Sequence, residues 1–128
     1  MRLNQVTVSV EDYDRAVAFY TLLGLRQIVA SPPHYARFEL PDGEATFSIE
    51  VVPNVPHSGQ PLIYFEVHNL DEAYAALTAN GIVFERGPAD QPWAWREAHF
   101  KDPFGNRLCL YHAGQNRRYP PWRIETKG

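Results

Sequence analysis

Residues 91–111, with the sequence QPWAWREAHFKDPFGNRLCLY, decide the predicted fold because they have the pattern of two strands joined by a tight turn. The turn runs from Asp102 to Asn106. Pro103 presets the backbone angle φ, and the Gly105–Asn106 pair tolerates positive φ. Two tryptophans and an arginine precede the turn, and an apolar run with the only cysteine follows it. We therefore expect a closing β-hairpin that the rest of the chain faces.

The composition is that of one ordinary soluble domain. The 128 residues suit a single domain, and 45% hydrophobic with 21% charged residues is typical of globular proteins. A net charge of −3 and a pI near 5.9 argue against nucleic acid as a partner, because phosphate binding needs a basic face. One cysteine forms no internal disulfide, which indicates a reducing, cytoplasmic setting. We expect no membrane span and no secretory signal.

The first half of the chain has the order β-α-β-β-β. Residues 3–10 alternate between polar and apolar side chains, which predicts a strand. Asp12 then suits a helix N-cap, apolar residues recur at helical spacing, and Gly24 ends the helix. Three further strands are predicted over 25–30, 35–40 and 45–52.

The second half repeats this order at an offset of 57 residues, with strands predicted over 62–67, 82–86, 95–101 and 107–111. Val67 matches Val10, Asn69 matches Asp12 as a helix cap, and Gly81 matches Gly24 as a helix stop. We therefore predict an α+β fold of two β-α-β-β-β modules within one domain, whose free sheet faces enclose a space. The parts are module one (3–52), a proline-rich linker (53–61), module two (62–112) and a polar tail (113–128) that we expect to be extended.

The opening and the closing hairpin together resemble the vicinal-oxygen-chelate superfamily, which includes glyoxalase I, bleomycin-resistance proteins and extradiol dioxygenases. The resembling stretches are LNQVTVSVED (3–12), AFY (18–20), LLGL (22–25) and DPFGNRL (102–108). The resemblance spans about residues 3–112. It implies paired β-α-β-β-β modules that form a cup-shaped mixed sheet, usually in a homodimer.

Metal-binding members of that superfamily take ligands at positions that fall here on Gln5, Glu50, Leu62 and Cys109. Gln5 and Glu50 match the usual ligand types, whereas Leu62 has no donor atom. Cys109 would bind as a thiolate, which suits zinc or softer ions. We therefore expect an incomplete metal site and no cofactor, with a divalent ion (Zn, Ni, Mn or Fe) as the alternative.

The segment before the turn resembles the bleomycin-resistance branch, whose members bind bulky drugs without metal chemistry. Trp93, Trp95 and Arg96 occupy its motif, with Ala94 where glycine is usual. Tryptophan offers a flat stacking surface, and arginine holds a carboxylate or stacks on a ring. By strand parity we expect Tyr64, Arg107 and Tyr111 to line the same pocket. The other reading is that both tryptophans pack structurally at a dimer seam.

Three functions remain open from the sequence. The first is a metal-independent protein that binds a small organic ligand in the cup. The second is a metal-dependent lyase, isomerase or dioxygenase of the glyoxalase type, with Glu50 as ligand and base. The third is a metal-free enzyme with Glu50 as the general base. Plainer roles also stand: Gln5 as a strand residue, Cys109 as a small buried residue and His99 as a structural histidine.

Overall fold

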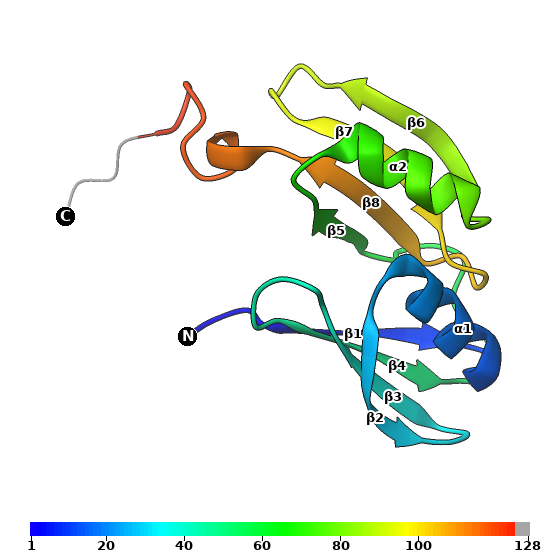
Figure 1. Ribbon diagram of the computed structural model, residues 1–128. Coiled ribbons are helices and arrows are strands. Elements are labelled where there is room, and N and C mark those ends of the chain that lie inside the picture. Colours follow the sequence, from blue (N-terminus) through cyan, green and yellow to red (C-terminus); the bar gives the residue numbers. More distant parts are fainter. Residues whose placement is uncertain (125–128) are drawn as a thin grey trace. The chain divides into compact units, whose positions relative to one another are not determined.

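A computed structural model describes residues 1–124 and confirms the two β-α-β-β-β modules (Figure 1). The first comprises β1 (Gln5–Val10), α1 (Tyr13–Leu23), β2 (Arg26–Ser31), β3 (Tyr35–Glu39) and β4 (Thr46–Val51). The second comprises β5 (Leu62–Glu66), α2 (Leu70–Ala79), β6 (Phe84–Asp90), β7 (Arg96–Lys101) and β8 (Arg107–His112). A short 3-10 helix, η1 (Gly114–Asn116), follows.

The two modules have the same strand order. The first sheet runs β1-β4-β3-β2 and the second runs β5-β8-β7-β6. In the first sheet β1 is parallel to β4, whereas β3 pairs antiparallel with both β4 and β2. One helix lies against one face of each sheet (Figure 1), which leaves the other face of each sheet without a helix of its own module.

Local signals in the sequence set the ends of both helices. The Asp12 side chain accepts a hydrogen bond from the backbone N–H of Arg15 at 3.0 Å, and Asn69 does the same for Glu72 at 3.1 Å. Gly24 ends α1 with φ of 114°, in the left-handed region that favours glycine. The predicted helix caps are therefore confirmed.

The core of the first module lies between α1 and the inner face of its sheet. Tyr20 is fully buried, and its ring centroid lies 4.6 Å from that of Phe47 and 6.1 Å from that of Phe38. Side chains of a strand point alternately to its two faces, so every second residue of each strand points toward α1. The buried apolar residues of this core include Val8, Val10, Ala16, Tyr20, Ala36, Phe38, Phe47 and Ile49.

Two predicted segments differ from the structure. The strand expected over 82–86 starts at Phe84 and runs to Asp90, with register shifts against β7 on both sides of Arg86. It includes Gly87 and Pro88 because β6 is an edge strand, where a missing N–H and a bulge are tolerated. The tail is not simply extended, since η1 follows β8; residues 125–128 lie outside the described part of the chain.

The described chain divides into two compact units. Residues 1–61 with 101–107 form the first, and residues 62–100 with the chain from 108 onward form the second. The turn between β7 and β8 therefore belongs to the unit that holds α1. Within residues 1–124, neither helix is both long and apolar enough to cross a membrane.

A buried carboxylate organises that turn. Asp102 Oδ1 accepts hydrogen bonds from the backbone N–H groups of Phe104 and Asn106, both at 2.9 Å. Its Oδ2 accepts from the Tyr20 hydroxyl and from Asn106 Nδ2, both at 2.7 Å. Gly105 has φ of 88°, as the predicted turn requires. Asp102 thus fastens the turn to α1 through Tyr20, a connection that the sequence pattern did not indicate.

Candidate functional site

The face of the second sheet opposite α2 carries an unusual set of side chains. Phe100 belongs to the helix side, because its ring contacts Phe84 and Phe84 contacts Tyr74 of α2. Strand alternation then places Glu97, His99, Cys109 and Tyr111 on the opposite face. We call this face, with Leu62 and Tyr64 of β5, the open face of the second sheet.

Three rings on this face form an aromatic cluster, defined by Tyr64, Trp95 and Tyr111. Trp95 stacks on Tyr111 with centroids 4.8 Å apart and planes at 26°. Tyr64 meets both rings edge-on, with centroids 5.8 Å from Trp95 and 5.4 Å from Tyr111. Such pairs are favourable beyond the area they bury. Tyr111 is buried whereas Tyr64 is 45% exposed, so the cluster has a solvent-facing side.

A pocket of about 400 Å³ adjoins Trp95. Ala94, which forms part of its wall, has φ of 67°, a conformation that favours glycine. The glycine that is usual at this position of the bleomycin-resistance motif would therefore suit the backbone conformation of Ala94. The pocket is lined by Asp90, Gln91, Ala94, Trp95, Arg96, His112, Ala113 and Asn116.

Next to the aromatic cluster lie three donor side chains in mutual contact. The Glu97 carboxylate is 3% exposed; its Oε1 lies 2.8 Å from His99 Nε2, and its Oε2 accepts from Trp93 Nε1 at 2.6 Å. Cys109 Sγ lies 3.7 Å from His99 Nε2 and 4.0 Å from Glu97 Oε1. Burial, and then the Glu97 carboxylate, raise the pKa of the Cys109 thiol to about 12.

Sequence reasoning missed this association. Its signal was weak: Glu97 and His99 alternate along one predicted strand, and Cys109 lies on the next. Only the pairing of β7 with β8 brings the three together. Trp93, predicted to bind ligand, donates its indole N–H to Glu97, and the residue as a whole is 45% exposed.

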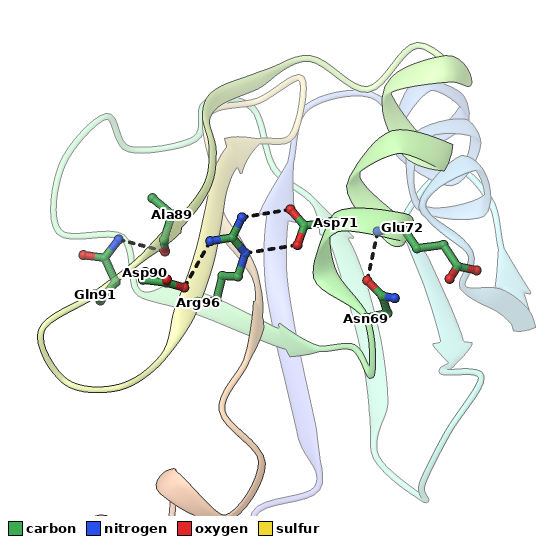
Figure 2. A network of polar contacts seen from close by, with 7 residues as sticks. All are labelled: Asn69, Asp71, Glu72, Ala89, Asp90, Gln91 and Arg96. Carbon is green, nitrogen blue, oxygen red and sulfur yellow. Dashed lines mark hydrogen bonds and ion pairs between the residues drawn. The ribbon is translucent and has the colours of Figure 1, made fainter.

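Arg96 points to the carboxylates of Asp71 and Asp90 (Figure 2). Its Nη2 and Nε contact the two oxygens of Asp71 at 2.9 and 3.2 Å, and its Nη1 contacts Asp90 at 3.0 Å. These hydrogen bonds raise the pKa of Arg96 above its usual value and lower that of Asp71. Arg96, the first residue of β7, therefore ties the start of α2 to the edge strand β6.

Arg107 belongs to the first unit. Its Nη2 donates to the carbonyl of Gln60 at 3.0 Å in the first unit. A separate pocket of about 330 Å³ surrounds it, lined by His57, Ser58, Gly59, Gln60, Lys101, Gly105 and Arg107. The structure therefore groups Trp95, Tyr64 and Tyr111 within the second unit, whereas Arg107 belongs to the first.

The open face of the first sheet is polar. Gln5 Nε2 donates to Ser48 Oγ at 2.5 Å, and Gln5 Oε1 accepts from the Thr46 hydroxyl. The Tyr35 hydroxyl lies 2.7 Å from Ser48 Oγ and accepts from Arg37 Nε at 2.9 Å. The hydrogen bond with Ser48 lowers the pKa of Tyr35.

The structure does not bring Gln5 and Glu50 together. Gln5 pairs with Thr46 across the parallel β1–β4 ladder, whereas Glu50 pairs with Ser9. Four residues of strand separate the two positions, which is about 13 Å. Glu50 Oε1 instead accepts a hydrogen bond from Ser9 at 3.2 Å. Leu62 also lacks a donor atom, so three of the four superfamily positions (Gln5, Glu50 and Cys109) carry one.

Comparison with known proteins places the chain among relatives of one fold. The sequence profile described as "Glyoxalase/Bleomycin resistance protein/Dioxygenase superfamily" matches residues 2–110. An uncharacterized protein of Bacillus subtilis (strain 168), YraH, is 30% identical in a match that covers 87% of this chain and 98% of YraH.

Solved structures of differently named proteins share the architecture. Lactoylglutathione lyase from Agrobacterium tumefaciens superposes with a TM-score of 0.73 at 19% identity, over 96% of this chain and 97% of the lyase. A bleomycin resistance determinant encoded on the transposon Tn5 superposes with a TM-score of 0.74 at 20% identity, over 88% of this chain and 98% of the determinant. These likenesses establish the fold alone.

Proposed function

The chain belongs to the Glyoxalase/Bleomycin resistance protein/Dioxygenase superfamily, and we propose that it binds a small organic molecule with a flat apolar part on the open face of its second sheet. The observation that carries this proposal is the aromatic cluster beside a pocket of about 400 Å³. A pocket of this size suits a drug-sized ligand. Binding would not depend on the four-residue metal site of the superfamily.

The aromatic cluster offers a stacking platform at low entropic cost. Trp95 is held by Tyr111 on one ring face and by a hydrogen bond from its Nε1 to the carbonyl of Asn116 at 3.4 Å. A ring that is already ordered loses little freedom when a ligand stacks on it. The exposed edge of Tyr64 extends the apolar surface.

Tryptophan fluorescence tests this proposal in buffer that contains EDTA. The probes are bleomycin and a panel of cationic, anionic and neutral fused-ring aromatic compounds. We expect at least one probe to quench the fluorescence saturably. Trp95→Leu should weaken the binding of that probe by about 2- to 13-fold, since a lost stacking contact is worth about 0.5–1.5 kcal/mol.

Trp122→Phe is the matched control, because Trp122 is 57% exposed and lies outside the aromatic cluster. Tyr64→Leu provides a second variant if Trp95→Leu does not fold. Binding that both cluster variants leave unchanged, or no saturable binding across the panel, would refute the proposal.

A second candidate is glyoxalase-type lyase, isomerase or dioxygenase chemistry, with Glu50 as base and as a ligand of a divalent metal. The observation in its favour is the exposed Glu50 carboxylate on the polar open face of the first sheet. Turnover of the hemithioacetal of methylglyoxal and glutathione, assayed with Zn²⁺, Ni²⁺, Mn²⁺ or Fe²⁺, tests it. Glu50→Gln should abolish this turnover, whereas Glu39→Gln should not; turnover that survives chelation would favour the metal-free enzyme.

We also propose a homodimer, the usual assembly of the superfamily. Light scattering during size-exclusion chromatography would then report twice the 14.7 kDa of the chain. A monomer at micromolar concentration would exclude a stable dimer.

A further inference from the structure

We propose that Glu97, His99 and Cys109 form a binding site for one divalent transition-metal ion of the zinc class on the open face of the second sheet. The site differs from the superfamily positions, with which it shares only Cys109. It is also independent of the organic ligand binding proposed above. Three side chains that carry oxygen, nitrogen and sulfur donors lie within 4.8 Å of one another there.

The distances between the donor atoms are close to those of a tetrahedral zinc site. With Zn–S bonds of about 2.3 Å and Zn–N or Zn–O bonds of about 2.0–2.1 Å, the donor–donor edges measure about 3.3–3.6 Å. The edges from Cys109 Sγ measure 3.7 Å to His99 Nε2 and 4.0 Å to Glu97 Oε1. The remaining edge, 2.8 Å between His99 and Glu97, is a hydrogen bond that must open by about half an ångström to admit the ion.

The donor set selects the class of ion. Thiolate and imidazole suit zinc, cobalt and copper, whereas magnesium and calcium require sites built from oxygen. Three protein donors leave a fourth tetrahedral position for water or another ligand. His99 is 17% exposed at its side chain, so an ion reaches the site from that side.

The surroundings hold the carboxylate in place. Trp93 Nε1 donates to Glu97 Oε2 at 2.6 Å, which leaves Oε1 directed at His99 and Cys109. Such outer contacts orient metal ligands in known sites. Glu97 and His99 also lie within the strand β7, which holds these two donor side chains on a rigid element.

Cobalt titration of the EDTA-treated, desalted protein tests the proposal. We expect one equivalent of Co²⁺ to produce a thiolate-to-cobalt charge-transfer band and the intense visible bands of tetrahedral cobalt, and Zn²⁺ to displace both. Cys109→Ser should abolish the charge-transfer band. His99→Gln and Glu97→Gln should each weaken Co²⁺ binding at least tenfold. His68→Gln, at an exposed histidine of the same unit, should leave binding unchanged.

A crystallographic measurement on the wild-type chain does not depend on any variant folding. Crystals soaked in Zn²⁺ should show an anomalous peak bonded to Cys109 Sγ, His99 Nε2 and Glu97 Oε1. Binding of Co²⁺ without a thiolate band, a zinc peak only at other residues, or no stoichiometric binding would overturn the proposal. Because the aromatic-probe assay runs in EDTA, either proposal can fail while the other stands.

Discussion

Replacement of Tyr20 by phenylalanine tests whether the buried Asp102 carboxylate fastens the closing turn to α1. The substitution removes one hydroxyl and keeps the ring that packs between Phe38 and Phe47. The lost contact is the 2.7 Å hydrogen bond from Tyr20 to Asp102 Oδ2. Asp102 still accepts hydrogen bonds from Phe104 and Asn106, so its carboxylate loses one partner but is not left without any.

The expected cost follows from the type of bond. A hydrogen bond to a charged acceptor contributes about 1.5–3 kcal/mol, and Tyr20 is fully buried, so water does not replace the lost donor. The free energy of unfolding should therefore fall by about 2 kcal/mol. For a chain of this length the melting temperature should fall by about 6–10 °C.

Urea unfolding followed by circular dichroism measures the change. The midpoint should fall while the slope stays constant, because the surface exposed on unfolding is unaltered. Tyr119→Phe is the control, since Tyr119 is 57% exposed and surface substitutions usually change stability by less than about 0.5 kcal/mol. A Tyr20→Phe cost no greater than that of this control would show that the bond does not stabilise the turn.

Three further results are expected. Burial, and then Asp102, hold the pKa of Tyr20 well above that of an unfolded tyrosine. The neutral Tyr20 hydroxyl therefore contributes its full stabilisation of the fold below about pH 10, and this contribution is lost as the pH rises further. In urea unfolding at alkaline pH, the free energy of unfolding should fall less with pH for Tyr20→Phe than for the wild-type chain. Gly105→Ala should cost about 1 kcal/mol in thermal unfolding, because the added methyl group meets no atom but φ is 88°, whereas Ala94→Gly at φ of 67° should cost nothing or stabilise slightly. Iodoacetamide at pH 8 should alkylate Cys109 at least about a thousandfold more slowly in the folded protein than in urea, because very little of a thiol with a pKa of about 12 is ionised at that pH. Equal rates in the two states would contradict the burial of Cys109.

The sequence by itself determined the elements and their order. Helix caps at Asp12 and Asn69, the stop at Gly24 and the Asp102–Asn106 turn are local signals, each read from a few neighbouring residues. The repeat at an offset of 57 residues then predicted two equal modules, which the structure confirms. These local signals did not predict that β6 continues through Pro88, because a proline is tolerated there only at the edge of the sheet, and the position of a strand in the sheet is not a local property.

Only the tertiary structure decided which side chains meet. Strand register placed Gln5 beside Ser48 instead of Glu50. Arg96 meets Asp71 of α2, 25 residues earlier in the chain.

The pairing of β7 with β8 likewise joined Cys109 to Glu97 and His99. The position of Gln5 depends on the alignment of β1 with β4, two strands that lie far apart in the chain. Backbone hydrogen bonding permits many such alignments, and only the packing of the whole sheet selects one of them.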